Sequence, residues 1–295
     1  MDVVTICEQP PPLRRPVLVA AFRGWNDAGE AASRALTTLT EALSPTEFAS
    51  VDPEEFFDFQ VARPTTRFDG AGRRRIGWPD NRFSWAPLPG AGRDVVVLDG
   101  TEPNLRWRAF VGGIVDLAQR LGIERVLTLG ALSVDVPHTR PSPLQCSTSD
   151  SQLPALLGLR HSTYEGPTGI TGILHDACVA AGIESVSIWV GVPHYLAATP
   201  YLASALALAE QTMEVLGTQL SLERLAHEAA AQRDDIAELL RDDEDLAEYV
   251  QDLETRMAAS EVEAEVEAEL PASTVSGDEL AAELERYLRE RPSDG

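Results

Sequence analysis

Five polar side chains that could bind or transform a small ligand follow apolar runs typical of buried strands. They are Asp27, Glu102, His138, Arg140 and His194. In an open parallel sheet, ligands bind in the crevice beyond the carboxyl ends of the strands. Carboxylates and imidazoles there can exchange protons, and a guanidinium can hold an anion in bidentate fashion. We therefore predict that these five residues form a candidate pocket at the carboxyl edge of the sheet.

Each of these residues also has a simpler structural explanation. Asp27 lies in the turn Phe22–Gly29 and precedes a helical pattern, so we favour a role as a helix N-cap, with Glu30 completing a capping box. Trp25 in the same turn either stacks on a ligand or packs on a neighbouring loop or subunit. His138 and Arg140 either bind an anion or anchor their long loop.

The rest of the chain offers no complete catalytic motif. All 24 basic residues are arginine, which excludes a Schiff-base lysine and a phosphate-loop lysine. The five histidines show no helical pairing typical of a metal site, and no serine lies in a nucleophile elbow. The segment Gly166–Gly169 opens a helix and is a weak candidate for binding phosphate on backbone amides. We predict no cofactor and no metal, and we favour a protein that is not an enzyme.

Strand and helix patterns alternate along the first two thirds of the chain. Continuous apolar runs predict strands at 17–22, 94–98, 125–132 and 185–190, separated by helical segments of about 10 to 15 residues. This alternation predicts an α/β fold, a three-layer α/β/α sandwich with a mostly parallel sheet. We also expect Asn104 to cap the helix at 106–121, and residues 73–78 and 82–85 to pair as a hairpin.

The C-terminal part differs in charge and pattern. Residues 219–295 carry 23 acidic and 7 arginine side chains, a net charge of −16, compared with −7 for residues 1–218. We predict a core domain over 1–218, a helical hairpin extension over 219–258, and an acidic linker with a terminal helix over 259–295. Alternating glutamates at 261–269 would repel one another on a helix, so we expect a solvated linker there, followed by a helix at 276–290.

The composition disfavours several classes of binding partner. The net charge of −23 disfavours binding to nucleic acid or to an anionic membrane surface. No apolar run approaches the roughly 20 residues that a membrane helix needs. Three widely separated cysteines without a disulfide framework, and a polar N-terminus, predict a cytoplasmic protein.

An ordered set of motifs resembles the PAC2 (proteasome assembly chaperone 2) family, in its actinobacterial branch. The motifs run from residue 17 to about 216 in order, and their ordered set is more specific than any one of them. They are Phe22–Gly29, Asp52–Asp58, Glu102–Trp107, Pro137–Pro141, Tyr164–Gly169 and Val192–Tyr195.

The resemblance implies an α/β/α core similar to nucleoside phosphorylase folds, in a homo-oligomer. In eukaryotic and archaeal relatives it implies a role in assembling or binding the 20S proteasome through a C-terminal hydrophobic-Tyr-X ending. This chain ends Arg289–Gly295, and its last tyrosine, Tyr287, lies eight residues from the end. We therefore expect that docking mechanism not to transfer.

These sequence features are compatible with two functions. The first is a non-catalytic, PAC2-like assembly or interaction protein, with a partner related to the proteasome. The alternative is a protein that binds a nucleoside or a phosphate-containing ligand, or a hydrolase- or phosphorylase-like enzyme, that uses the pocket at the strand exits.

Overall fold

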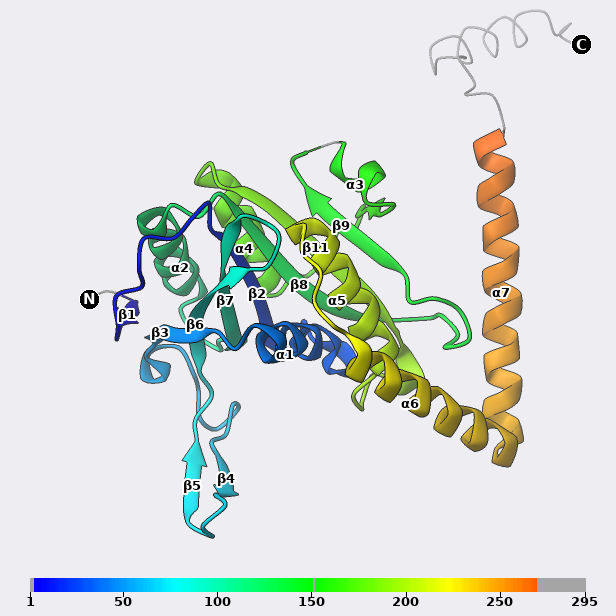
Figure 1. The fold of residues 1–295 in the computed structure, drawn as a ribbon. Helices are drawn as coiled ribbons and strands as arrows, with labels where there is room; N and C mark the ends of the chain where they lie inside the picture. The colour runs from blue at the N-terminus through cyan, green and yellow to red at the C-terminus, as the bar shows by residue number, and fades with distance from the viewer. Residues whose placement is uncertain (1–2, 151, 270–295) are drawn as a thin grey trace, which may run out of the picture. The chain divides into compact units, whose positions relative to one another are not determined.

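Within the residues that the computed structural model describes, 3–150 and 152–269, nine strands form one mixed sheet (Figure 1). The order across the sheet is β1-β3-β6-β7-β2-β8-β11-β9-β10. The strands are β1 (Val4–Ile6), β2 (Val17–Arg23), β3 (Thr46–Val51), β6 (Asn81–Leu88), β7 (Arg93–Thr101), β8 (Arg125–Val134), β9 (Leu144–Thr148), β10 (Arg160–His161) and β11 (Glu184–Pro193). A separate two-stranded sheet joins β4 (Thr65–Phe68) to β5 (Arg74–Gly77).

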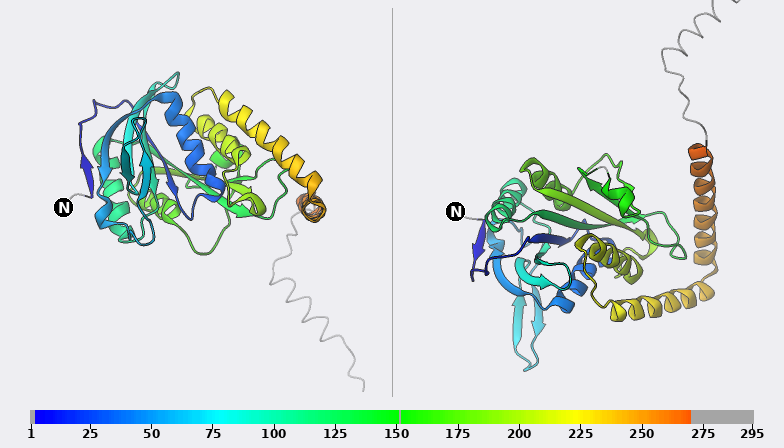
Figure 2. Two further views of the ribbon diagram at one scale, coloured as in Figure 1. Left: turned by 90° about the horizontal axis from the view of Figure 1, so that it is seen from below. Right: turned by 45° about the horizontal axis from the view of Figure 1, so that its top comes forward.

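Helices cover both faces of the nine-stranded sheet, which gives three layers (Figure 2). Helices α1 (Ala31–Leu43) and α5 (Leu202–Leu216) pack with the side chains of one face. Helices α2 (Trp107–Leu121) and α4 (Ile170–Ala180) pack with those of the other. A short helix, α3 (Leu153–Leu156), follows β9. The predicted three-layer α/β fold is confirmed.

The four central strands, β7, β2, β8 and β11, are parallel, and this is the part of the sheet that the sequence predicts best. Strand β2 alternates between the two cores: Val19 packs with α1 and α5, whereas Phe22 packs with α2 and α4. Because both faces are buried, the strand is apolar at every position from Val17 to Phe22, as the continuous run indicates. The flanking strands β6 and β9 pair antiparallel to this centre.

Two local predictions are wrong because tertiary pairing decides them. Residues 82–85 do not form a hairpin with 73–78, since β6 pairs with β3 and β7, whereas β5 pairs with β4. Asn104 does not cap α2: its side-chain oxygen accepts the backbone N–H of Asp58 at 3.0 Å and so holds a neighbouring loop. Helix α2 instead begins after Arg106, which has a left-handed backbone with φ 56°.

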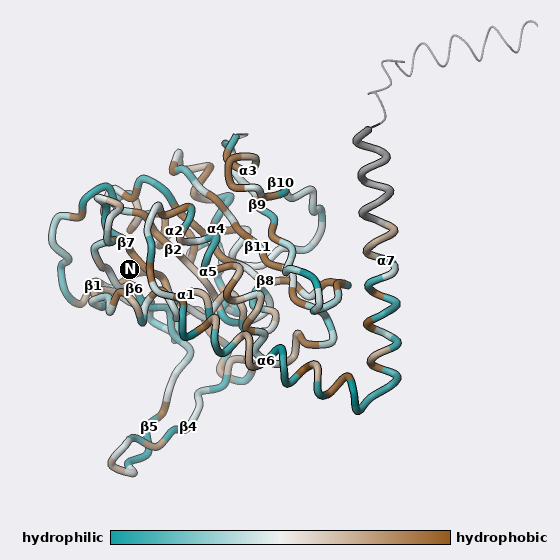
Figure 3. Tube along the Cα trace, turned by 45° about the vertical axis from the view of Figure 1, so that its right-hand side comes forward, coloured by the Kyte–Doolittle hydropathy of each residue, from teal (hydrophilic) through white to brown (hydrophobic). Residues whose placement is uncertain are grey.

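The C-terminal helices are α6 (Glu223–Asp242) and α7 (Glu244–Glu269). Helix α6 packs on α5 through Leu225 and Ile236, and apolar and polar positions alternate along it (Figure 3). The chain divides into two compact units, Met1–Ala247 and Glu248–Gly295. The finer predicted boundaries after residues 218 and 258 stay a prediction.

The expected linker at 261–269 is wrong, because α7 runs through it to Glu269. Glutamate and alanine are strong helix formers, and repulsion between glutamates four residues apart costs only a few tenths of a kcal/mol per pair. The helical propensity of the segment therefore outweighs its charge repulsion. The helix predicted at 276–290 lies outside the described residues.

Candidate functional site

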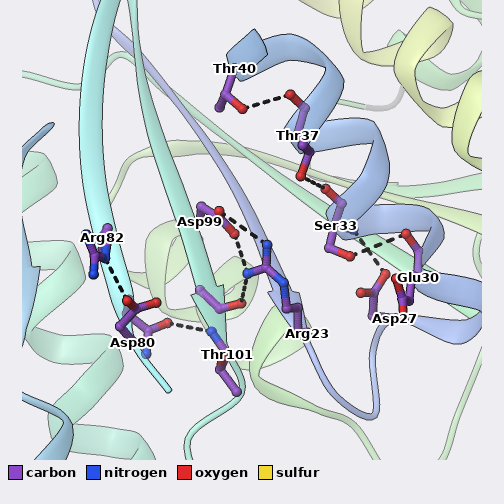
Figure 4. Close-up of polar contacts among 12 residues, drawn as sticks. Arg23, Asp27, Glu30, Ser33, Thr37, Thr40, Asp80, Arg82, Asp99 and Thr101 are labelled. Carbon is purple, nitrogen blue, oxygen red and sulfur yellow. Dashed lines mark hydrogen bonds and ion pairs between the residues drawn. The ribbon is translucent and has the colours of Figure 1, made fainter. Parts of the chain in front are cut away.

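The turn after β2 positions Asp27 at the N-terminus of α1 (Figure 4). One carboxylate oxygen of Asp27 accepts the backbone N–H groups of Ala32 at 2.8 Å and Ser33 at 3.0 Å. The Asp27 side chain caps α1 as predicted, but a 3-10 turn over Ala28–Glu30 separates it from the helix, and Glu30 occupies the position next to the helix. The predicted capping box with Glu30 is wrong, because the backbone N–H of Asp27 donates to the carbonyl of Gly24 at 3.1 Å. Burial raises the pKa of Asp27, against the opposing effect of these hydrogen bonds. The Asp27 carboxylate therefore satisfies backbone groups of its own chain.

Glu102, just beyond β7, caps the second helix that begins at this edge. Its Oε1 atom accepts the side-chain amide of Asn26 at 2.7 Å and the backbone N–H of Ile170, the first residue of α4, at 2.9 Å. Its Oε2 atom accepts the backbone N–H of Trp25 at 3.3 Å. Glu102 thereby joins the exit of β2 to the N-terminus of α4.

The N-terminus of α4 thus holds an internal anion. The sequence made Gly166–Gly169 a weak candidate for binding phosphate on backbone amides, but the N–H of Ile170 already binds Glu102. Gly169 also packs directly on Asn26: a Cβ atom at Gly169 would lie 2.1 Å from the Oδ1 atom of Asn26. That oxygen is buried and has no hydrogen-bond partner in the structure. The junction between the β2 turn and α4 is therefore closely packed.

A second cluster forms where β8 and β11 end. The hydroxyl of Tyr195 accepts the backbone N–H of His138 at 2.8 Å and lies 2.7 Å from its Nδ1 atom. The rings of His138 and His194 both meet that of Tyr195 edge to face. The Nδ1 atom of His194 lies 3.3 Å from a carboxylate oxygen of Asp135. These contacts bring His138 and His194 together through Tyr195.

The five predicted site residues therefore do not gather into one group. Asp27 and Glu102 each cap a helix, whereas His138 and His194 belong to the aromatic cluster around Tyr195. Arg140 is exposed, and its backbone N–H closes a turn on the carbonyl of Pro137. Whether these residues bind a ligand stays a prediction.

Two contributors to these clusters, Asn26 and Tyr195, were not predicted. Tyr195 directly follows His194 in the exit loop of β11, and Asn26 directly precedes Asp27. Their position next to a predicted site residue was the one signal in the sequence that could have indicated them. Their role depends on long-range contacts, with Glu102 and His138 respectively, that spacing along the chain does not show.

The basic side chain at the end of β2 is also paired. Arg23 binds both carboxylate oxygens of Asp99 on β7, the nearer at 2.6 Å (Figure 4). Surface grooves of the described residues also lie elsewhere. One, of about 570 Å³, runs along α2 beside Val3, Arg106 and Arg120.

His175 and Cys146, a base and a nucleophile by residue type, are both buried. The Nδ1 atom of His175 lies 2.8 Å from the hydroxyl of Ser185, and burial lowers the pKa of His175. Cys146 is fully buried on β9, and burial raises the pKa of its thiol. Within residues 3–150 and 152–269, no three His, Cys, Asp or Glu side chains are grouped to hold a metal ion.

Comparison with known proteins identifies the family. The model of the PAC2 family matches residues 21–240. The chain belongs to the PAC2 family. A PAC2 family protein from Streptomyces avermitilis is 43% identical, with a TM-score of 0.72, over 80% of this chain and 99% of that one. A Mycobacterium tuberculosis proteasome-assembly chaperone homologue is 40% identical, with a TM-score of 0.72, over 79% and 99% of the respective chains.

A third solved structure extends the similarity. A Mycobacterium tuberculosis protein of unknown function is 30% identical with a TM-score of 0.82, over 90% of this chain and 92% of that one. No curated protein gave a significant match. Among the described residues of this PAC2 family member, no helix combines the length and apolar character needed to span a membrane.

Proposed function

We propose that this PAC2 family member is a non-catalytic assembly or interaction protein that works through contacts with other proteins. The observation that carries the proposal is the occupation of two helix N-termini at the carboxyl edge of the sheet by the chain's own carboxylates. Asp27 binds the first turn of α1, and Glu102 binds the first N–H of α4.

Helix N-termini attract anionic ligands because their unpaired N–H groups and the helix dipole favour negative charge. Here Asp27 and Glu102 supply that charge. A phosphate or carboxylate ligand would have to displace a carboxylate that is already bonded, and the displaced group would remain nearby as a repelling charge. This arrangement favours a structural role for the carboxyl edge of the sheet over a binding site for an anionic substrate.

The class of partner is drawn from a relative. The Mycobacterium tuberculosis neighbour at 40% identity is described as a proteasome-assembly chaperone homologue. An archaeal proteasome activator from Pyrococcus furiosus has a TM-score of 0.65 at 16% identity, which supports the shared fold alone. We infer that the partner of this chain is a proteasome subunit or an assembly intermediate.

Native mass spectrometry can test this proposal. The full chain would be mixed with purified α and β subunits of an actinobacterial 20S proteasome, separately and together, with an unrelated acidic protein as the control. We expect a complex of defined stoichiometry with the subunits and none with the control. Free chain and free subunits alone, at micromolar concentrations of each, would contradict the proposal.

The alternative, a small-ligand protein, draws support from the cluster of His138, Tyr195, His194 and Asp135. Imidazoles and a phenol can bind a nucleoside or a phosphate ester. A thermal-shift screen with nucleosides, nucleotides and sugar phosphates discriminates the two functions, because a ligand at about 100 times its Kd stabilises the folded state by about 2.7 kcal/mol. We expect no saturable shift. A shift that disappears in a His138→Gln variant would favour the alternative.

A further inference from the structure

The hairpin formed by β4 and β5 projects from the nine-stranded sheet with both of its faces uncovered (Figure 1). All eight residues of the two strands are exposed. An isolated two-stranded hairpin is at best marginally stable in water, because it has no face against which to bury its side chains. A hairpin held in this position is therefore suited to packing against another molecule.

Large apolar side chains concentrate in and beside this hairpin. Val61, Phe68, Ile76 and Trp78 are between 45% and 71% exposed. They account for four of the ten exposed large hydrophobic residues in the described parts of the chain. Phe68 and Ile76 lie on one face, since Thr66 pairs with Ile76 and Phe68 pairs with Arg74 in the antiparallel register. Exposed apolar side chains gathered in this way are typical of a protein interface.

The hairpin is basic although the chain is strongly acidic. Residues 61–78 contain five arginines and one aspartate, a net charge of +4 on a chain of −23. Asp69 binds Arg73 and Arg75, so Arg67 and Arg74 are the strand arginines that are free of an acidic partner in the described residues. Arg74 lies on the same face as Phe68 and Ile76, whereas Arg67 lies on the other. A basic group beside apolar ones favours an acidic partner surface that is partly apolar.

The turn of the hairpin is preorganised. One carboxylate oxygen of Asp69 accepts the backbone N–H groups of Ala71 and Arg73, and the hydrogen bond to Arg73 lowers the pKa of Asp69. At the base, the rings of Phe59 and Trp78 meet edge to face with centroids 4.8 Å apart. Because this geometry exists before binding, docking incurs a smaller entropic cost.

We propose that this hairpin, residues 61–78, docks on helix α7 of a second copy of the chain. Helix α7 is the chain's own acidic element, with ten acidic residues and one arginine over Glu244–Glu269, a net charge of −9. Ala258 and Ala259, which are exposed on the described part of α7, offer short apolar side chains for Phe68 and Ile76. This contact would be an interface of the homo-oligomer that the family resemblance implies. It does not depend on the proteasome proposal.

Sedimentation velocity of the full chain, over a range of protein and salt concentrations, tests the contact. We expect self-association that weakens at 1 M salt, where the Debye length is about 3 Å. The double variant Arg67→Glu and Arg74→Glu should weaken the association roughly tenfold or more. The matched control, Arg108→Glu and Arg160→Glu, makes the same charge change at exposed sites elsewhere and should associate like the unmodified chain.

Two further variants test the apolar contribution of the hairpin and the identity of α7 as its partner. Phe68→Ser with Ile76→Ser removes the apolar contribution without touching charge and should also weaken association. Glu248→Arg with Asp252→Arg, at two exposed acids on α7, should weaken self-association, yet its mixture with the Arg67→Glu and Arg74→Glu variant should form a mixed oligomer. An unmodified chain that stays monomeric, an unchanged association in the hairpin variants, or a mixture that fails to associate would each overturn the proposal.

Discussion

The Oε1 atom of Glu102 lies 2.7 Å from the side-chain nitrogen of Asn26 and 2.9 Å from the backbone nitrogen of Ile170. One carboxylate oxygen thus connects the exits of two parallel strands to the helix that covers them. Because Asn26 is fully buried, its amide would lose its hydrogen bond if Glu102 were removed, and water would not replace it.

This contact predicts a graded loss of stability. Glu102→Gln keeps one acceptor oxygen and should lower the free energy of unfolding by about 1 kcal/mol, whereas Glu102→Ala should lower it by about 2 to 3 kcal/mol. A double-mutant cycle with Asn26→Ala should give a coupling of about 1 kcal/mol or more in urea unfolding. Glu8→Ala, at an exposed acid, is the control. A cycle with zero coupling would contradict the pairing.

Gly169 provides a steric test of the same junction. Its φ of −101° suits any residue, so a cost on substitution must come from the close approach of Asn26. Gly169→Ala should destabilise the fold by about 1 to 3 kcal/mol. Gly112→Ala on α2 meets no atom within 4 Å and should stabilise the fold slightly, by roughly 0.5 to 1 kcal/mol. Equal effects of the two substitutions on the unfolding midpoint would show that the junction is loose.

Asp27 gives a prediction with two parts. Asp27→Ala removes the cap of α1 and should lower the free energy of unfolding by about 1 to 2 kcal/mol. Burial raises the pKa of Asp27 in the folded state above its pKa in the unfolded state. The contribution of Asp27 to the free energy of unfolding is therefore greatest at pH values below the unfolded-state pKa, and it falls as pH rises through the folded-state pKa. Asp27→Asn keeps an acceptor and should remove this dependence.

Urea unfolding between pH 3 and 7 measures both parts of the Asp27 prediction. Asp116→Asn, at an exposed position on α2, serves as the matched control for the charge change. Identical stability profiles for the Asp27→Asn variant and the unmodified chain would show that the carboxyl group titrates normally.

His175 should make the fold sensitive to mild acid. Its pKa is lowered by burial, with a partial opposing effect from Asp176, so the unfolded chain takes up the proton first as pH falls below about 6.5. Stability should then decrease, by at most about 1.4 kcal/mol per pH unit, until the folded-state pKa is reached. His175→Gln should flatten this part of the profile, and His161→Gln, at an exposed site, should not. Equal slopes in all three proteins between pH 7.5 and 5 would refute the assignment.

The centre of the fold was predictable because burial on both faces leaves a continuous apolar run. Val17–Phe22 and the run ending at Leu98 show this pattern, and both are central strands. The flanks were less predictable. Strand β9 carries polar residues and gains its place by pairing with β11 and β10, and the partner of β5 is decided by contacts that a short pattern does not encode.

The candidate site was likewise predictable only in part. The capping role of Asp27 was predictable, since an Asx residue before a helical pattern satisfies nearby N–H groups. The role of Glu102 was not, because its partners Asn26 and Ile170 lie 76 and 68 residues away in the sequence. Local patterns thus identified the residues at the strand exits, whereas their pairing required the fold.

The most direct test of the account is the time course of 20S proteasome assembly from purified actinobacterial α and β subunits, with and without the full chain. We predict that the chain joins an assembly intermediate, changes the rate at which the mature particle forms, and is recovered chemically unchanged. Native gel electrophoresis with mass identification of each band would show this. Identical time courses, with no band that contains both the chain and a subunit, would contradict it.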